Sequence, residues 1–112
     1  MTRLFVLLAA AAFPLSPHAL SPAAKEFMAI ARALEPAHCE RRKLRREIAL
    51  ARVQGEDAAA LERRFAELDR DVKVARLEKR LAALEPRVRA SGDPEDLPAI
   101  SHQHREAFYR CE

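Results

Sequence analysis

The chain is poor in several residue types that catalytic and nucleic-acid-binding folds use. Its 112 residues include no Trp, one Tyr, two Gly and two Cys. Two glycines at separate sites cannot form a glycine-rich phosphate loop, and so few aromatics leave the basic residues without the stacking platforms of nucleic-acid readers. The apolar core Leu4–Ala12 is far shorter than the ~20 residues needed to span a bilayer.

Long helices are what the remaining composition favours. Ala, Arg, Leu and Glu are abundant, apolar residues recur at helical spacing, and charged residues make up 33% of the chain. This composition is typical of helical hairpins and coiled coils rather than of sheets. We therefore expect a single all-α domain over residues 20–112.

Residues 1–19 have the features of a secretory signal peptide. Arg3 gives a short positive region, the apolar run follows it, and Pro14 and Pro17 then interrupt any helix. Small residues allow cleavage after Ala12 or after Ala19. The sequence predicts export, to the periplasm or the medium, and the high Arg and Ala content suggests a bacterial source.

Two charged amphipathic segments flank the turn Gln54–Asp57. Ser21 and Pro22 are suited to begin the first helix, and its apolar stripe keeps its phase across Pro36 except at Arg41, so we expect one helix kinked near Pro36. Gly55 supplies a left-handed residue for the turn. Residues 40–52 have a net charge of +4 and residues 56–71 of −3, which favours an antiparallel hairpin.

The segment after the turn has two apolar stripes on nearly opposite helix faces. Leu61, Phe65 and Leu68 belong to the first stripe, and the second runs through Val74, Leu77, Leu81, Leu84 and Val88. One straight helix cannot present both stripes to the first helix. A break near Lys73, a second partner segment within the chain and a homodimer contact would each resolve this, and we favour the second partner segment.

A short third helix is predicted from Ser101 to about Arg110, with Gly92 as the cap that ends the helix before it. Its apolar positions share one face, which we expect to pack on the Leu77–Val88 stripe. This return path carries Cys111 toward Cys39. A disulfide is the common device by which small exported domains compensate for a modest core, so we predict a Cys39–Cys111 bond.

A non-enzymatic binding protein is the function that these features favour, acting as a scaffold, an adaptor or a chaperone-like protein. We expect a protein partner or a homodimer, with no nucleic acid, no cofactor and no small-molecule substrate. Ser101, His104 and Glu106 have the residue types of a catalytic triad, but six adjacent positions on a helix cannot converge on a substrate. The predicted contact residues are apolar: Phe27, Val74, Leu77, Leu81, Leu84 and Val88.

Two alternative functions use polar residues. The first is periplasmic metal binding or sensing through His38, His102 and His104, since a disulfide would bring these segments together. The second is weak binding to anionic membrane or cell-wall components through a basic patch, which consists of Arg41, Arg42, Lys43, Arg45 and Arg46.

Overall fold

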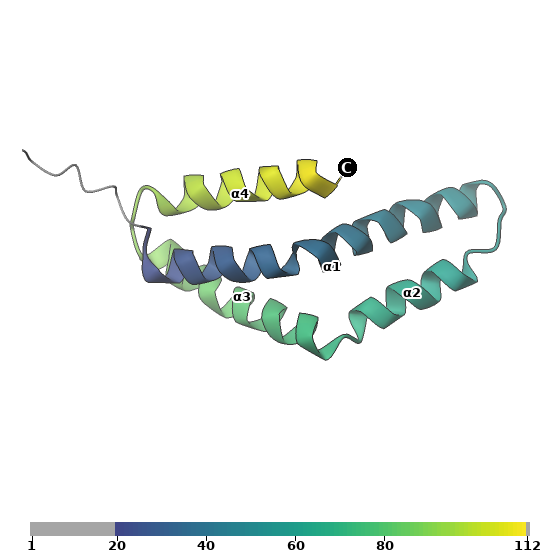
Figure 1. Cartoon of the computed structure of the whole chain (residues 1–112), viewed down its shortest axis with the longest axis horizontal. Helices are drawn as coiled ribbons and strands as arrows, with labels where there is room; N and C mark the ends of the chain where they lie inside the picture. The colour runs from purple at the N-terminus through teal and green to yellow at the C-terminus, as the bar shows by residue number, and fades with distance from the viewer. Residues whose placement is uncertain (1–19, 112) are drawn as a thin grey trace, which may run out of the picture.

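The computed structural model describes residues 20–111 and shows an all-α fold within that range. Four helices follow one another: α1 (Pro22–Val53), α2 (Ala59–Asp69), α3 (Val72–Ala90) and α4 (Asp96–Cys111) (Figure 1). The predicted signal peptide, residues 1–19, lies outside the described residues. No helix within residues 20–111 combines the length and the apolar character that crossing a bilayer requires.

Helix α1 is continuous, as the phase of its stripe predicts. The Ser21 hydroxyl accepts a hydrogen bond from the Ala24 backbone N–H (3.2 Å), and Pro22 occupies the first turn, where its missing N–H costs nothing. Pro36 lies inside the helix and removes the hydrogen bond to the Arg32 carbonyl. Figure 1 shows α1 changing direction near its middle, in agreement with a bend at Pro36.

The turn after α1 is a Schellman motif centred on Gly55. Its φ is +69°, its N–H bonds the Arg52 carbonyl (3.2 Å), and the Glu56 N–H bonds the Ala51 carbonyl (2.8 Å). The Asp57 carboxylate then accepts from the Ala59 N–H (2.9 Å) and starts α2. The predicted hairpin turn is thus confirmed, although the N-cap position of α2 is Ala58, which has no side-chain cap.

The segment after this turn is two helices rather than one arm. Helix α2 ends at Asp69 and α3 starts at Val72, because the Asp71 carboxylate caps α3 by accepting from the N–H groups of Lys73 (2.9 Å) and Val74 (3.1 Å). Our preference for a second partner segment was wrong on this point. Of the three resolutions considered, the break near Lys73 is the one that occurs.

This break lets both apolar stripes face α1. Leu68 in α2 and Leu84 and Val88 in α3 are all buried, while α2 and α3 each pack on α1. Val72, at the junction of the two stripes, is 70% exposed. In one continuous helix the two stripes would lie on nearly opposite faces. The elbow between α2 and α3 changes the orientation of the second stripe, so that both stripes face α1.

Helix α4 differs from expectation at its start and in its neighbour. It starts at Asp96 rather than at Ser101, because Pro98 falls in the first helical turn, where proline is tolerated. It packs mainly on α1 and touches α3 only weakly, so the predicted packing on the Leu77–Val88 stripe is wrong. That stripe is already covered by α1.

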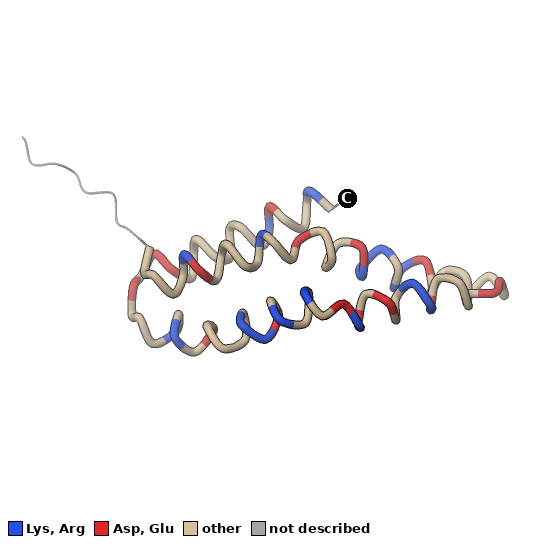
Figure 2. The backbone as a smooth tube through the Cα atoms, turned by 60° about the horizontal axis from the view of Figure 1, so that its bottom comes forward, with Lys and Arg blue, Asp and Glu red and all other residues tan. Residues whose placement is uncertain are grey.

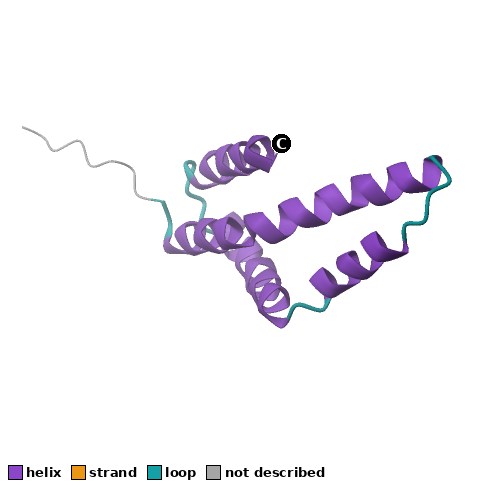
Figure 3. Ribbon diagram, turned by 45° about the vertical axis from the view of Figure 1, so that its right-hand side comes forward, coloured by secondary structure: helices purple, strands orange, loops and turns teal. Residues whose placement is uncertain are grey.

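The result is an elongated molecule with two unlike halves. Figures 1 and 3 show α3 and α4 on opposite sides of the first half of α1, and α2 alone beside its second half. We call residues 20–39 with α3 and α4 the proximal end, and residues 44–69 the distal arm. Basic and acidic residues alternate along both helices of the distal arm (Figure 2).

Charge pairing between the antiparallel helices follows the prediction only in part. Arg52 pairs with Glu62 (2.7 Å) in the expected sense, basic on α1 and acidic on α2. Arg64 on α2 pairs with Glu40 on α1 (2.6 Å) in the reverse sense. Both pairs are exposed, so each contributes only ~0.2–1 kcal/mol and the buried apolar residues must do more.

Candidate partner-binding groove

A groove of about 570 Å³ lies between α1 and α4. Its apolar lining comes from three helices, with Leu81 contributed by α3. The polar lining lies on the middle of α1, from Glu35 to Arg42, and on the middle of α4, from Ser101 to Arg105. The full set is Phe27, Met28, Ala31, Glu35, His38, Arg42, Leu81, Ile100, Ser101, Gln103, His104, Arg105, Ala107 and Phe108.

The groove exists because α4 is held along α1 at several points. Near the middle, the Gln103 side-chain amide donates to the Met28 carbonyl (2.8 Å). Toward the end, Arg110 pairs with Glu35 (2.8 Å). Met28, Glu35 and Gln103 also line the groove, so these polar contacts form part of its wall.

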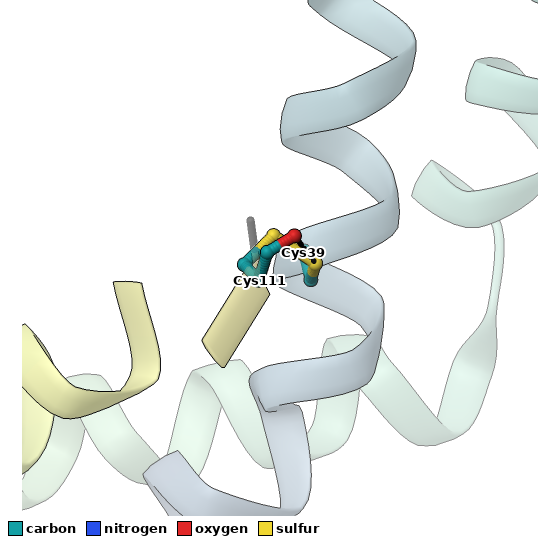
Figure 4. The surroundings of a disulfide bond; sticks show 2 residues. All are labelled: Cys39 and Cys111. Carbon is teal, nitrogen blue, oxygen red and sulfur yellow. Dashed lines mark hydrogen bonds between the residues drawn. A yellow bond between two sulfur atoms is a disulfide. The ribbon is translucent and has the colours of Figure 1, made fainter. Parts of the chain in front are cut away.

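A disulfide closes the same interface at the end of α4. Cys39 and Cys111 are bonded, with their Cα atoms 5.5 Å apart, and Cys111 is buried. Figure 4 shows the last turn of α4 meeting the side of α1 at these two residues. The predicted pairing is confirmed, and it fixes the position of the groove wall that α4 provides.

The start of α4 is fixed by a buried carboxylate. Asp96 has no exposed surface and receives hydrogen bonds from the Ser21 N–H (3.0 Å), the Ser21 hydroxyl and the Ser91 hydroxyl (2.7 Å). The hydrogen bond from Ser21 is the main reason why the pKa of Asp96 is below its ordinary value, and it outweighs the opposing effect of burial. Asp96 thereby joins the N-terminus of α1 to the corner between α3 and α4.

Arg41 explains the one interruption in the apolar stripe of α1. Its guanidinium lies 3.0 Å from Glu78 on α3 and 3.4 Å from Asp69 on α2, so a single side chain spans the elbow. His38 also contacts Glu78, at 3.1 Å. Burial would raise the pKa of Glu78, but the hydrogen bonds from Arg41 and then His38 keep that pKa below its ordinary value.

The predicted contact residues divide into three groups. Phe27 and Leu81 line the groove. Val74 and Leu77 are half-buried away from it. Leu84 and Val88 are buried in the core, with 0% and 4% exposure, and therefore cannot form an exposed patch as predicted, because α1 covers their face of α3.

The three histidines are not assembled into one site. His38 and His104 both line the groove, but His102 does not, and His38 is engaged by Glu78. Within residues 20–111, no group of three or more His, Cys, Asp or Glu side chains is placed to hold a metal ion. The spacing of His102 and His104, two residues apart on a helix, directs them to different faces.

The basic patch is distributed around α1 rather than gathered on one face. Arg41 spans the elbow, the Arg42 guanidinium lies 4.7 Å from the centre of the Phe108 ring, and that of Arg45 lies 5.5 Å from the Phe65 ring. Lys43 and Arg46 are exposed. Successive helical residues are 100° apart, so these five side chains reach three different neighbours and do not form the single basic surface that was predicted.

Comparison with protein-family models, with curated proteins and with solved structures gives no match. Inference about function therefore starts from the geometry of this chain. The groove residues that sequence reasoning did not single out are mostly on α4, among them Ile100, Gln103 and Phe108. The helical spacing of Ile100 and Phe108 did indicate an apolar face, but this face was predicted to pack on α3.

Proposed function

We propose that this protein is an exported, non-enzymatic adaptor that binds another protein through the groove between α1 and α4. The single observation that carries the proposal is the groove itself, which has a mainly apolar interior and lies outside the core. Its volume of about 570 Å³ is in the range of functional binding sites. Export is supported by the sequence of residues 1–19 and by the Cys39–Cys111 bond, since disulfides persist in oxidising compartments.

The dimensions of the groove favour a helix that lies over it. From Phe27 to Arg42 the groove follows α1 for ~22 Å at ~1.5 Å per residue. A helix of about 15 residues spans the same length, so one apolar face of a partner helix can place its side chains along the whole groove.

A helical partner also avoids unpaired backbone groups. The groove walls are helices whose own backbone N–H and C=O groups bond within the helix, so they offer few partners to an extended strand. A helix satisfies its own backbone and needs only an apolar face with residues at i, i+3, i+4 and i+7. We therefore propose an amphipathic helix as the binding element of the partner.

A matched pair of substitutions on α1 tests this proposal. Ala31 lines the groove and Ala33 is exposed on another face of the same helix. Ala31→Arg should block capture of the partner from a cell-envelope extract of the source organism, whereas Ala33→Arg should leave capture intact, with helicity unchanged in both. Equal capture by the two variants would contradict binding at the groove.

The cellular location has its own test. Mass spectrometry of the non-reduced protein recovered from the exported fraction should show a chain cut after Ala12 or after Ala19 that is two hydrogen masses lighter than the dithiol form. Recovery of the full-length chain in the cytosol with both thiols free would contradict export.

A further inference from the structure

One end of the groove carries a cationic group that lacks a partner. Arg42 lines the groove, and its Nη1 atom is buried without a hydrogen-bond partner. Its guanidinium lies over the Phe108 ring at 4.7 Å, which explains why the side chain rests there. Stacking on a ring does not supply an acceptor for the buried N–H groups, and a buried donor left unpaired is costly.

The acidic groups nearby are already engaged. Glu35, the one carboxylate in the groove lining, is paired with Arg110 (2.8 Å). Glu78 is held by Arg41 and His38. Within residues 20–111, Arg42 therefore has no carboxylate of its own.

A second guanidinium adds to the charge of this end of the groove. Arg105 lines the groove, is exposed and makes no ion pair with any other residue of the range 20–111. It lies three residues before Phe108 on α4, which places it one helical turn from the ring that Arg42 covers. Two arginines and one engaged glutamate leave the lining with a positive charge.

We propose that the partner helix carries a carboxylate next to its apolar face, and that Arg42 and Arg105 bind it. This inference rests on the proposed function, because it names the chemistry of the helix that the groove receives. A carboxylate can accept two N–H groups of one guanidinium at once, so a turn of the Arg42 side chain toward the groove would let it satisfy Nη1, which is buried and unpaired in the free protein. The apolar anchors would then occupy the part of the groove near Phe27, Ala31 and Ile100.

Three synthetic helical peptides serve as defined probes. Each has roughly 18 residues, with leucines at i, i+3 and i+7 to fill the apolar part of the groove and one variable residue at i+11. The variable residue is glutamate, glutamine or lysine. The helical rise places it ~16 Å from the first leucine, which is within the ~22 Å length of the groove.

Binding of these probes to the oxidised protein is measured by fluorescence anisotropy at low and at high salt. The glutamate probe should bind about tenfold more tightly than the glutamine probe, the expected effect of a charge-assisted hydrogen bond, and the lysine probe should bind most weakly. The preference for glutamate should shrink as salt rises. All three affinities should fall in the Ala31→Arg variant.

Two arginine variants assign the preference to a residue. Arg42→Met should reduce the preference of glutamate over glutamine severalfold, leaving only the share that Arg105 supplies, while Arg46→Met, at an exposed position outside the groove, should keep it in full. The glutamine probe reports whether the groove survives the substitution, because its affinity does not depend on the missing charge. An unchanged preference in Arg42→Met would overturn the assignment.

The failures of the two proposals are distinguishable. Equal binding of all three probes would overturn the carboxylate inference and leave the apolar groove standing. No saturable binding of any probe would overturn both. Sedimentation of the protein alone completes the set: a concentration-dependent dimer that Ala31→Arg abolishes would make a second copy of this chain the occupant, and would overturn a separate partner.

Discussion

The proximal end and the distal arm share helix α1 but stabilise it in different ways. At the proximal end, α1 lies between α3 and α4, and Leu34 and Leu84 are completely buried. In the distal arm, α1 has only α2 beside it, and Ile48, Ala51 and Ala58 form a small cluster. Leu50 and Val53, near the tip, are 55% and 85% exposed.

This difference shows what a third helix and a disulfide add to a helical hairpin. The proximal groove measures about 570 Å³ and is mainly apolar, whereas the hollow of the distal arm measures about 290 Å³ and includes Arg45, Arg52 and Glu62 in its lining. Two helices alone bury only a small apolar cluster, Ile48, Ala51 and Ala58, and leave Leu50 and Val53 exposed. The binding site is therefore expected at the proximal end, where α4 provides a second wall.

Removing the disulfide, which only the proximal end has, should cause the largest loss of stability. The double variant Cys39→Ser/Cys111→Ser should lose ~4 kcal/mol of stability, because the bond closes a long loop in the unfolded chain. Urea denaturation followed by circular dichroism measures this loss. A change below ~1 kcal/mol would mean that the bond does not constrain the unfolded state as described.

Truncating one leucine at each end should give the next largest effect. Leu84→Ala should cost ~3 kcal/mol, because this side chain is fully buried and its loss leaves a cavity. Leu68→Ala should cost less, ~2 kcal/mol, since Leu68 lies at the edge of a two-helix contact with 9% exposure. Thermal and urea melts measure the two losses of stability. A larger loss for Leu68→Ala than for Leu84→Ala would contradict the view that the proximal end is the better packed.

Acid should loosen the proximal end first. Hydrogen bonds or ion pairs lower the pKa values of Glu26, Glu78 and Asp96, and all three residues lie in or against the proximal helices. A lowered pKa means that the charged carboxylate stabilises the folded state above the ordinary carboxyl pKa of ~4 and that this contribution is lost as the pH falls through the lower folded value.

The variant Asp96→Asn tests the acid response at one residue. The variant should be less stable than the wild type near neutral pH. The neutral amide has one acceptor oxygen and no charge, so its hydrogen bonds from Ser21 and Ser91 are fewer and weaker than those of the carboxylate. The difference should start to narrow at ~4, where the unfolded chain binds the proton, and should vanish as the pH falls through the lower pKa of folded Asp96. A gap in melting temperature that stays constant from neutral to acidic pH would contradict this role.

Glycine substitution should give the smallest and most even effect. Gly55 ends α1 in the distal arm and Gly92 follows α3 at the proximal end, with φ values of +69° and +66° and no atom near the position of an added Cβ. Gly55→Ala and Gly92→Ala should therefore each cost ~1 kcal/mol through backbone strain alone. Strongly unequal costs would show that packing, and not local backbone conformation, determines the stability cost at one of the two turns.

Helix starts, bends and ends could be predicted from the sequence wherever a single residue determines the local conformation. Ser21 and Pro22 begin α1, Pro36 bends it, Gly55 and Gly92 follow the helices they were expected to end, and the two cysteines pair. The cap at Asp71 was equally local, with an acidic residue directly before an apolar stripe, but it was not recognised. The elbow between α2 and α3 was therefore left as one of three alternatives.

Tertiary placement was not readable in the same way. The apolar face of α4 could pack on α1 or on α3, and periodicity does not choose between neighbours. Arg41 was assigned to a basic patch and Asp96 was given no role, yet each of them joins three segments of the chain. The groove depends on these placements, so only Phe27 and Leu81 of the predicted contact residues belong to it, and its members His38, Arg42 and His104 had been given other roles.

The central claim is that the disulfide holds α4 on α1 and thereby makes the proximal end different from the distal arm. Amide hydrogen exchange of the oxidised and the reduced protein tests this claim most directly. Exchange measured residue by residue by NMR reports the local opening of each helix. Reduction should remove protection from the amides of α4 while those of α2 keep theirs. Equal loss of protection in α2 and α4, or full protection of α4 after reduction, would contradict the account.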